Sequence, residues 1–217
     1  MAETVSGYAA VYYRDGDAGT EYELMEGLVE RIRTGAFDSA IARGDDCIAC
    51  VNHNQDLTFA RVSNGTNVLS VDDTGLRYEA TPPDTQFGRD LLVQVERGDF
   101  HRSSFAFIPK YEFEERSDGP DVAWIVDMQR LYDVSPVSFP AYTGTTADVR
   151  GETRFNTPNF PPNVSIRFVS RENETVEQAK QYCGDVFEQY RKFKEAKAEE
   201  RKAAEVTREA RIKLAQM

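Results

Sequence analysis

Two stretches of the chain, HRSSFAFIPKYEFEE at 101–115 and VAWIVDMQRLYDVSPVSF at 122–139, decide the fold class. Both are rich in the aromatic and β-branched residues that favour strands. The turn-forming sequence RSDGPD at 116–121 lies between them. We therefore predict two strands joined at this turn, within a mainly β and mostly antiparallel body.

Earlier parts of the chain contain more short strand-like segments, separated by turn residues. The Asn-Gly pair in SNGT at 63–66 predicts a hairpin between its two flanking strands. Many short strands with few helices indicate a barrel or a sandwich. The predicted strands are SGYAAVYY (6–13), EYELMEGLVERI (21–32), CIACV (47–51), LTFARV (57–62), NVLSVDD (67–73) and GLRYEAT (75–81).

Two short helices are predicted within this body. TGAFDSAIARGDD at 34–46 has apolar residues at helical spacing followed by a glycine, which is typical of a helix end. PPDTQFGRDLLVQVERGD at 82–99 places its apolar residues on one helical face. Asp84 or Thr85 can cap this second helix, and Gly98 can end it.

The chain changes character after the β body. Prolines and asparagines between 151 and 170 indicate an irregular linker, and the sequence from 171 to 217 has helical composition. Apolar residues from Val176 to Phe193 recur at alternating spacings of three and four, as in a coiled coil or a docking helix. We therefore divide the chain into a β domain at 1–150, a linker at 151–170 and a charged helical tail at 171–217.

Composition excludes several classes of function. The formal net charge is −11, and it lies in the β body, because the tail carries 11 basic and 10 acidic residues. Nucleic acid binding needs basic patches, so no nucleic acid partner is expected. No stretch approaches the ~20 apolar residues of a membrane span, and the N-terminus lacks the pattern of a secretion signal. Three cysteines do not form a disulfide framework, and we expect a cytosolic protein.

The first candidate site is a metal site. Cys47, Cys50 and His53 have the spacing C-x-x-C-x-x-H, and His101 or Cys183 could supply a fourth ligand for zinc. However, a zinc knuckle needs a turn, and positions three apart on a strand point to opposite faces. Two buried cysteines with no metal are the favoured interpretation, so no cofactor is predicted.

The second candidate site is a nucleophilic one. Ser103 and Ser104 lie in HRSSFAF, on opposite faces of a predicted strand. A serine hydroxyl needs an adjacent base to become a nucleophile, and His53 is a candidate for that base.

A third group, usually a carboxylate, must hold such an imidazole in the right tautomer. Asp133 ends a predicted strand and could do so, but Asp121, Asp127 and many other acids could also serve. Spacing alone does not choose among them, and it does not choose between the two serines.

Five segments, in order, resemble the tailed-phage prohead (head-maturation) serine protease family, over positions 6 to about 150. Each segment alone is weak evidence for the family, but five segments in the same order are strong evidence. They are GYAAVYY, LVERIRTGAFDSAI, VNHN, GLRYEATPPDTQFGRDLLVQVERGDFHRSSFAF and LYDVSPVSFPAYTGT.

This resemblance implies a role for each site residue. His53, in the family's Asn-His, would be the general base at the end of a rigid strand, within hydrogen-bond reach of its nucleophile. Ser104, before Phe-x-Phe, would be the nucleophile, and Asp133, before Val-Ser-Pro, would orient the histidine. Two positions depart from the family pattern: Ala106 replaces a glycine, and Asp133 replaces a glutamate.

The resemblance also implies a fold and a setting. The family is related in fold to herpesvirus maturation proteases, which implies a closed β-barrel flanked by helices, here followed by a helical tail. The implied substrates are the major capsid protein with its scaffolding segments, and the protease itself, cut inside the assembling prohead in the host cytoplasm. The herpesvirus relatives suggest a homo-oligomer. The rival interpretation is a catalytically inactive scaffolding or shell-assembly protein with the same barrel.

Overall fold

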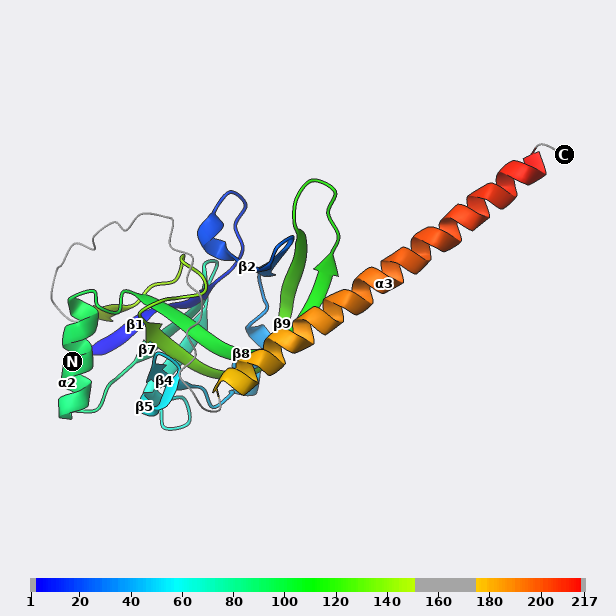
Figure 1. The fold of residues 1–217 in the computed structure, drawn as a ribbon. Coiled ribbons are helices and arrows are strands. Elements are labelled where there is room, and N and C mark those ends of the chain that lie inside the picture. Colours follow the sequence, from blue (N-terminus) through cyan, green and yellow to red (C-terminus); the bar gives the residue numbers. More distant parts are fainter. Residues whose placement is uncertain (1–2, 151–174, 216–217) are drawn as a thin grey trace. The chain divides into compact units, whose positions relative to one another are not determined.

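The computed structural model describes residues 3–150 and 175–215 (Figure 1). The chain divides into two compact units, Met1–Arg167 and Phe168–Met217, each of which is described by itself. The first unit holds the strands and two α-helices, and the second holds the long helix α3. The predicted linker at 151–170 lies outside the described residues.

The strands of the first unit pair as two sheets. The smaller sheet has the order β10-β1-β7-β6, and all of its neighbours are antiparallel. It consists of β10 (Asp148–Arg150), β1 (Thr4–Val11), β7 (Gly75–Ala80) and β6 (Asn67–Val71). The larger sheet has the order β2-β3-β9-β4-β5, with β8 also paired to β9. It consists of β2 (Glu21–Met25), β3 (Leu28–Ile32), β9 (Asp121–Val137), β4 (Ile48–Val51), β5 (Asn54–Arg61) and β8 (Arg102–Glu114).

Strand β9 organises the larger sheet. Its first part pairs in parallel with β3, and its second part pairs in parallel with β4 at Asp133 and Val134. Antiparallel β8 follows it over its length, and this long hairpin is visible in Figure 1. Within that ladder Ser104 lies directly opposite Ser135. The hairpin therefore brings residues from 102–106 and 133–137 side by side.

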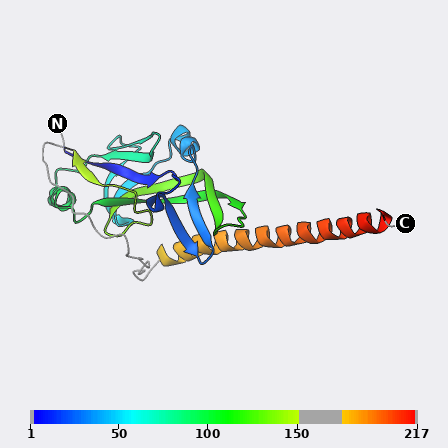
Figure 2. The ribbon, with the colours of Figure 1, turned by 90° about the horizontal axis from the view of Figure 1, so that it is seen from above.

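One hydrophobic core joins both sheets and the short helices α1 (Asp38–Arg43) and α2 (Gln86–Glu96). Phe105 of β8 packs edge-on against Phe37, with ring centroids 5.7 Å apart, and Val134 of β9 lies in the same cluster. Because successive side chains of a strand alternate between its faces, the neighbouring Ser104 faces the opposite side of the sheet. Figure 2 shows the two sheets and their helices from above.

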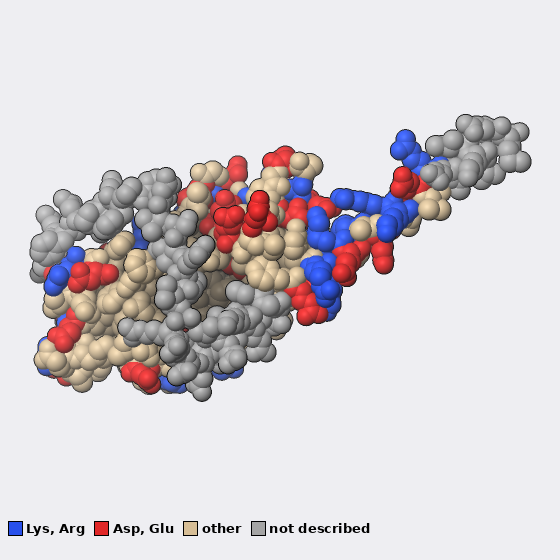
Figure 3. All heavy atoms as spheres, in the orientation of Figure 1, with Lys and Arg blue, Asp and Glu red and all other residues tan. Residues whose placement is uncertain are grey.

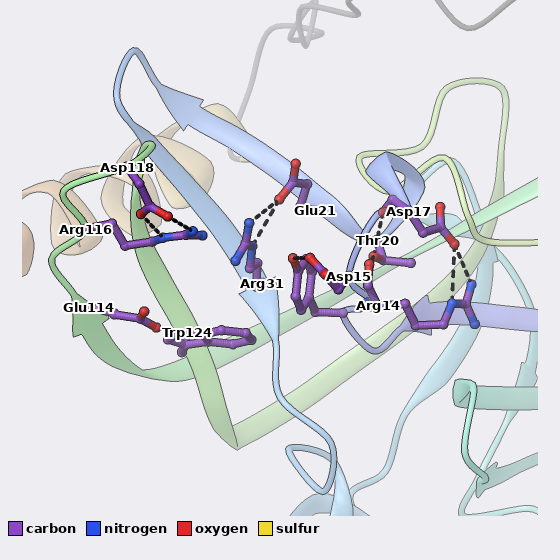
Figure 4. A network of polar contacts seen from close by, with 11 residues as sticks. Arg14, Asp15, Asp17, Thr20, Glu21, Arg31, Glu114, Arg116, Asp118 and Trp124 are labelled. Atoms are coloured by element: carbon purple, nitrogen blue, oxygen red, sulfur yellow. Dashed lines mark hydrogen bonds and ion pairs between the residues drawn. The ribbon is translucent and has the colours of Figure 1, made fainter.

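Polar contacts join β2 to β3 and, separately, link residues within the β8–β9 hairpin (Figure 4). The Arg31 guanidinium donates from Nε and Nη2 to Glu21 and lies 3.9 Å from the centroid of the Tyr13 ring. Trp124 Nε1 donates to Glu114 across the hairpin at 2.7 Å. The 3-10 turn η1 (Ala18–Thr20) is capped by Asp17, whose side chain accepts the Gly19 N–H.

Several sequence predictions are confirmed. The strands at 47–51, 75–81, 101–115 and 122–139 form as β4, β7, β8 and β9. Helix α2 begins after Thr85, whose side chain accepts the Gly88 N–H, and Gly98 takes a φ of 82° just beyond its end.

The predicted hairpin around SNGT is wrong. The chain does turn there, and Gly65 N–H donates to Val62 O at 2.9 Å. The two flanking strands nevertheless belong to different sheets, since β5 pairs with β4 and β6 pairs with β7. No ladder joins β5 to β6, so the described strands form two separate sheets that do not close on each other. The predicted closed barrel is therefore not confirmed.

Helix α3 (Thr175–Ala215) is unbroken over 41 residues, or about 60 Å at 1.5 Å per residue. Charges of both signs run along its described surface (Figure 3). Lys192 pairs with Glu188 at 2.7 Å. Side chains in the first part of the predicted apolar seam lie outside the described residues. Among the described helices, none has the length and apolar content needed to cross a membrane.

Candidate active site

His53 lies in a tight turn between β4 and β5. Val51 pairs with Asn54, which leaves Asn52 and His53 as the only residues that reverse the chain. Both have positive φ, 52° and 56°, as a two-residue type I′ hairpin requires. His53 was predicted to lie at the end of a strand. It lies instead in the turn that follows the strand. Positive φ is uncommon for a residue other than glycine, and such outliers cluster at functional sites.

The turn is held against the end of β9 by backbone hydrogen bonds. Asn52 N–H donates to Pro136 O at 3.1 Å, and Ser138 N–H donates to Asn52 Oδ1 at 3.0 Å. His53 N–H donates to Ser135 Oγ at 3.3 Å. These bonds place the His53 backbone beside the part of β9 that carries Asp133.

The His53 imidazole contacts the Asp133 carboxylate directly. His53 Nδ1 lies 2.7 Å from Asp133 Oδ1, and the two side chains are 23% and 6% exposed. Because a carboxylate only accepts, Nδ1 carries the proton, and Nε2 of the neutral ring is an acceptor. The neutral ring of this pair therefore has the tautomer that a general base needs, and the His53 side chain is partly exposed.

Ser104 lies on the same face of the sheet as Asp133. It is opposite Ser135 in the β8–β9 ladder, which makes Asp133 its diagonal neighbour, at a typical spacing of about 7–8 Å. No hydrogen bond within the described part of the chain joins the Ser104 hydroxyl to His53. The predicted base–nucleophile hydrogen bond is thus not formed here, and such bonds often tighten only when substrate is bound.

The two neighbouring serines differ in what their hydroxyl groups do. Ser103 Oγ donates to Thr146 O at 2.8 Å and lies 2.8 Å from the Tyr78 hydroxyl, facing the core. The hydroxyl of Ser104 has no such partner among the residues described. The hydroxyl groups of the two adjacent serines thus differ, since that of Ser103 is bonded within the core and that of Ser104 is not.

The structure also separates the candidate carboxylates. Asp121 accepts a backbone N–H within the β8–β9 turn, and Asp127 accepts the Ser39 hydroxyl. Both lie at other places on β9, whereas Asp133 contacts His53. Spacing in the sequence does not distinguish these acids, whereas contact with His53 does.

The residues of the candidate zinc site take other roles. Cys50 lies buried on β4 and Cys47 lies buried just before it, and burial raises the pKa of both thiols, to about 12 for Cys50. His101 Nδ1 lies 3.2 Å from a backbone carbonyl just after α2. The Cys183 side chain lies outside the described residues. Within the described part of the chain, no group of three or more His, Cys, Asp or Glu side chains could hold a metal ion.

Sequence reasoning missed two residues of this site, Asn52 and Ser135. Asn52 shapes the turn and binds it to β9, and an asparagine before His53 is a weak signal for such a turn. Ser135 lies two residues after Asp133, so strand periodicity places both on one face. Its polar side chain within a buried strand was the available signal.

Comparison with known protein families places the site within a family match. The sequence model of a family described as caudovirus prohead serine protease matches residues 1–159, which includes every residue of the site. No curated protein matches the chain.

Proposed function

Because the chain belongs to the family of caudovirus prohead serine proteases, we propose that it is a serine endopeptidase in which Ser104, His53 and Asp133 act together. The observation that carries the assignment is the 2.7 Å contact between His53 Nδ1 and Asp133 Oδ1, with an unengaged serine hydroxyl on the same sheet face. A base, a group that orients it and a nucleophile on separate segments are what acyl transfer requires.

The reaction has two stages. Ser104 Oγ attacks the peptide carbonyl carbon while His53 Nε2 takes the hydroxyl proton. Asp133 holds the Nδ1–H and stabilises the imidazolium that forms. His53 then gives the proton to the leaving amine, the C–N bond breaks, and an ester on Ser104 remains. A water molecule, deprotonated by His53, hydrolyses that ester and restores the enzyme.

We propose capsid proteins and their scaffolding segments as substrates, cut within the assembling prohead in the host cytoplasm, together with self-cleavage. Family membership supports this class of substrate. Helix α3 supports a recruiting role for the tail, because it is long and carries charges of both signs along its described surface. Deletion of 171–217 should lower incorporation into proheads, measured by mass spectrometry of purified particles, and unchanged incorporation would reject recruitment by the tail.

The decisive test compares two adjacent serines. Ser104→Ala should abolish cleavage of co-expressed capsid protein and labelling by a fluorophosphonate probe. Ser103→Ala is the matched control, because it removes a buried hydroxyl one residue away, and it should retain both. Peptide mapping should find the probe on Ser104. A different result is a capsid protein of the same length in cells that express the wild-type protein and in cells that express the Ser104→Ala variant. That result would favour the rival hypothesis, in which the chain is an inactive component of the shell.

The pH dependence of the reaction tests the base. Only neutral imidazole can accept the serine proton, and histidine side chains generally lose their proton between about pH 5 and 8. The value of kcat/KM for a peptide substrate should therefore rise with pH through this range. A rate that does not change across it would count against His53 as the base.

A further inference from the structure

Ser135 lies at the centre of the candidate site, in contact with both His53 and Asp133. It is wholly buried on β9, directly opposite Ser104 and two residues beyond Asp133. Its hydroxyl reaches three different segments of the site: the turn that carries His53, the carboxylate, and the strand β4 through Cys50. A serine in a strand does not require three such partners to be buried, so this set of contacts calls for an explanation.

Every hydrogen-bonding position of this hydroxyl is used. Ser135 Oγ donates its proton to Asp133 Oδ1 at 2.8 Å and accepts the His53 N–H at 3.3 Å. Cys50 Sγ lies 3.2 Å away, and because burial raises the thiol pKa to about 12, the thiol keeps its proton and donates. One donor and two acceptor lone pairs are the full capacity of a serine hydroxyl.

The bonds to Asp133 and His53 have separate consequences. The bond to Asp133 gives its Oδ1 a second donor beside His53 Nδ1, which fixes the carboxylate rotamer. The bond from His53 N–H attaches the left-handed turn to β9 at the residue that carries the imidazole. Both ends of the His53–Asp133 pair are therefore oriented by one atom, Ser135 Oγ.

We propose that Ser135 is a positioning residue that sets the mutual orientation of the His53 imidazole and the Asp133 carboxylate. This inference deepens the proposed function and rests on it for its kinetic consequences. Ser135 has no part in covalent chemistry, since its proton is engaged by Asp133 and its side chain is buried. It acts through His53 and Asp133 alone.

Ser103 provides a matched comparison. It is equally buried, lies on the adjacent strand β8 and also has a hydroxyl that makes several hydrogen bonds. The partners of its hydroxyl are Tyr78 and Thr146, and Thr145 bonds its backbone; none of these residues belongs to the proposed triad. Loss of the Ser103 hydroxyl should therefore affect stability without changing the orientation of the imidazole.

Kinetics of purified full-length variants form the first test. Ser135→Ala should lower kcat about 10- to 100-fold, as expected when catalytic groups are misplaced by about an ångström, and leave KM within about threefold. Ser135→Thr, which keeps the hydroxyl, should recover most of the lost kcat, and Ser103→Ala should keep kcat near the wild-type value. A Ser135→Ala protein that folds and retains full kcat would overturn the proposal.

Nuclear magnetic resonance gives a second readout that does not depend on activity. In an inert Ser104→Ala background, the His53 Nδ1–H proton should resonate far downfield because it is bonded to a carboxylate. Adding Ser135→Ala should move or broaden that signal, whereas adding Ser103→Ala should leave it in place. If Ser135→Ala does not fold, the same signal is measured in Ser135→Cys, which keeps the shape of the side chain but has a weaker donor. The signal should again move or broaden.

The two readouts separate the two hypotheses. If Ser104→Ala still cleaves, the proposed nucleophile is wrong, while the resonance still decides whether Ser135 orients the imidazole. If Ser104→Ala is inactive but the resonance is identical with and without the Ser135 hydroxyl, the positioning role is wrong and the proposed function stands.

Discussion

Two buried carboxylates in the β body accept the same number of side-chain hydrogen bonds yet have different chemistry. Asp133 on β9 accepts from the His53 imidazole and the Ser135 hydroxyl. Glu30 on β3 accepts from the hydroxyl groups of Tyr111 and Tyr142. Each carboxylate therefore joins elements that are distant in the sequence.

The partners of the two carboxylates decide what each can do. Burial raises the pKa of Glu30, and burial also raises the pKa of Tyr142 well above its usual value. The Tyr142 phenol thus keeps its proton at neutral pH, and the Glu30 cluster serves as a structural link between β3, β8 and the segment after β9. His53, by contrast, exposes part of an imidazole, a side chain that can exchange protons near neutral pH. A buried acid becomes part of a reactive site through a titratable and accessible partner.

The largest effect should appear in kcat when the acid of the His53 cluster is replaced by its amide. Asp133→Asn should lower kcat on the order of 10³- to 10⁴-fold, because an amide cannot hold the Nδ1–H tautomer or stabilise the imidazolium. Single-turnover cleavage of a capsid-derived peptide measures the loss, and a thermal melt provides the control for folding. Activity within tenfold of wild type would remove Asp133 from the triad.

An intermediate effect should appear at the second cluster, in stability instead of rate. Tyr142→Phe keeps the ring but leaves Glu30 with one fewer donor in a buried site, which should lower the free energy of unfolding by about 1–3 kcal/mol. Urea denaturation in the Ser104→Ala background avoids self-digestion. In the active background kcat should stay within about threefold, and a larger loss would show that the two clusters are coupled.

The smallest effect should be a change in pH dependence. Because the folded-state pKa of Glu30 is raised above 4.5, its usual value, folding favours the protonated acid, and this contribution to stability is lost as pH rises through the folded pKa. Glu30→Gln cannot ionise, so its stability relative to wild type should improve as pH rises above about 4.5. Parallel stability curves for the two proteins between pH 4 and 8 would contradict a buried, proton-binding Glu30.

The sequence predicts elements best where the signal is local. Helix α2 has its cap, its apolar face and its glycine stop within one segment, and β8 and β9 have long runs of strand-forming residues. The Asn-Gly signal at 64–65 predicted a turn that does form, but strand pairing is not local. β5 pairs with β4 and β6 pairs with β7, so the predicted hairpin between β5 and β6 does not form.

The candidate site could be predicted only in part. The residues alone provided His53 and two serines, while family resemblance selected Ser104 and Asp133. The hydrogen bonds that Ser135 and Asn52 accept from the His53 and Ser138 N–H groups could not be inferred, since donor and acceptor are 82 and 86 residues apart in the chain. The turn that carries His53 was not predicted because neither Asn52 nor His53 is a glycine, the residue that adopts positive φ most readily.

The left-handed backbone of His53 has a consequence for laboratory evolution of this protein. Glycine is the residue that best suits the second position of such a hairpin turn, and a larger side chain there costs about 1 kcal/mol or more. His53→Gly would relieve this backbone cost but would also take the imidazole donor away from the buried Asp133 carboxylate, so the two effects on stability oppose each other. Any screen for more stable variants should retain a requirement for cleavage, because selection for folding alone does not select for the imidazole itself.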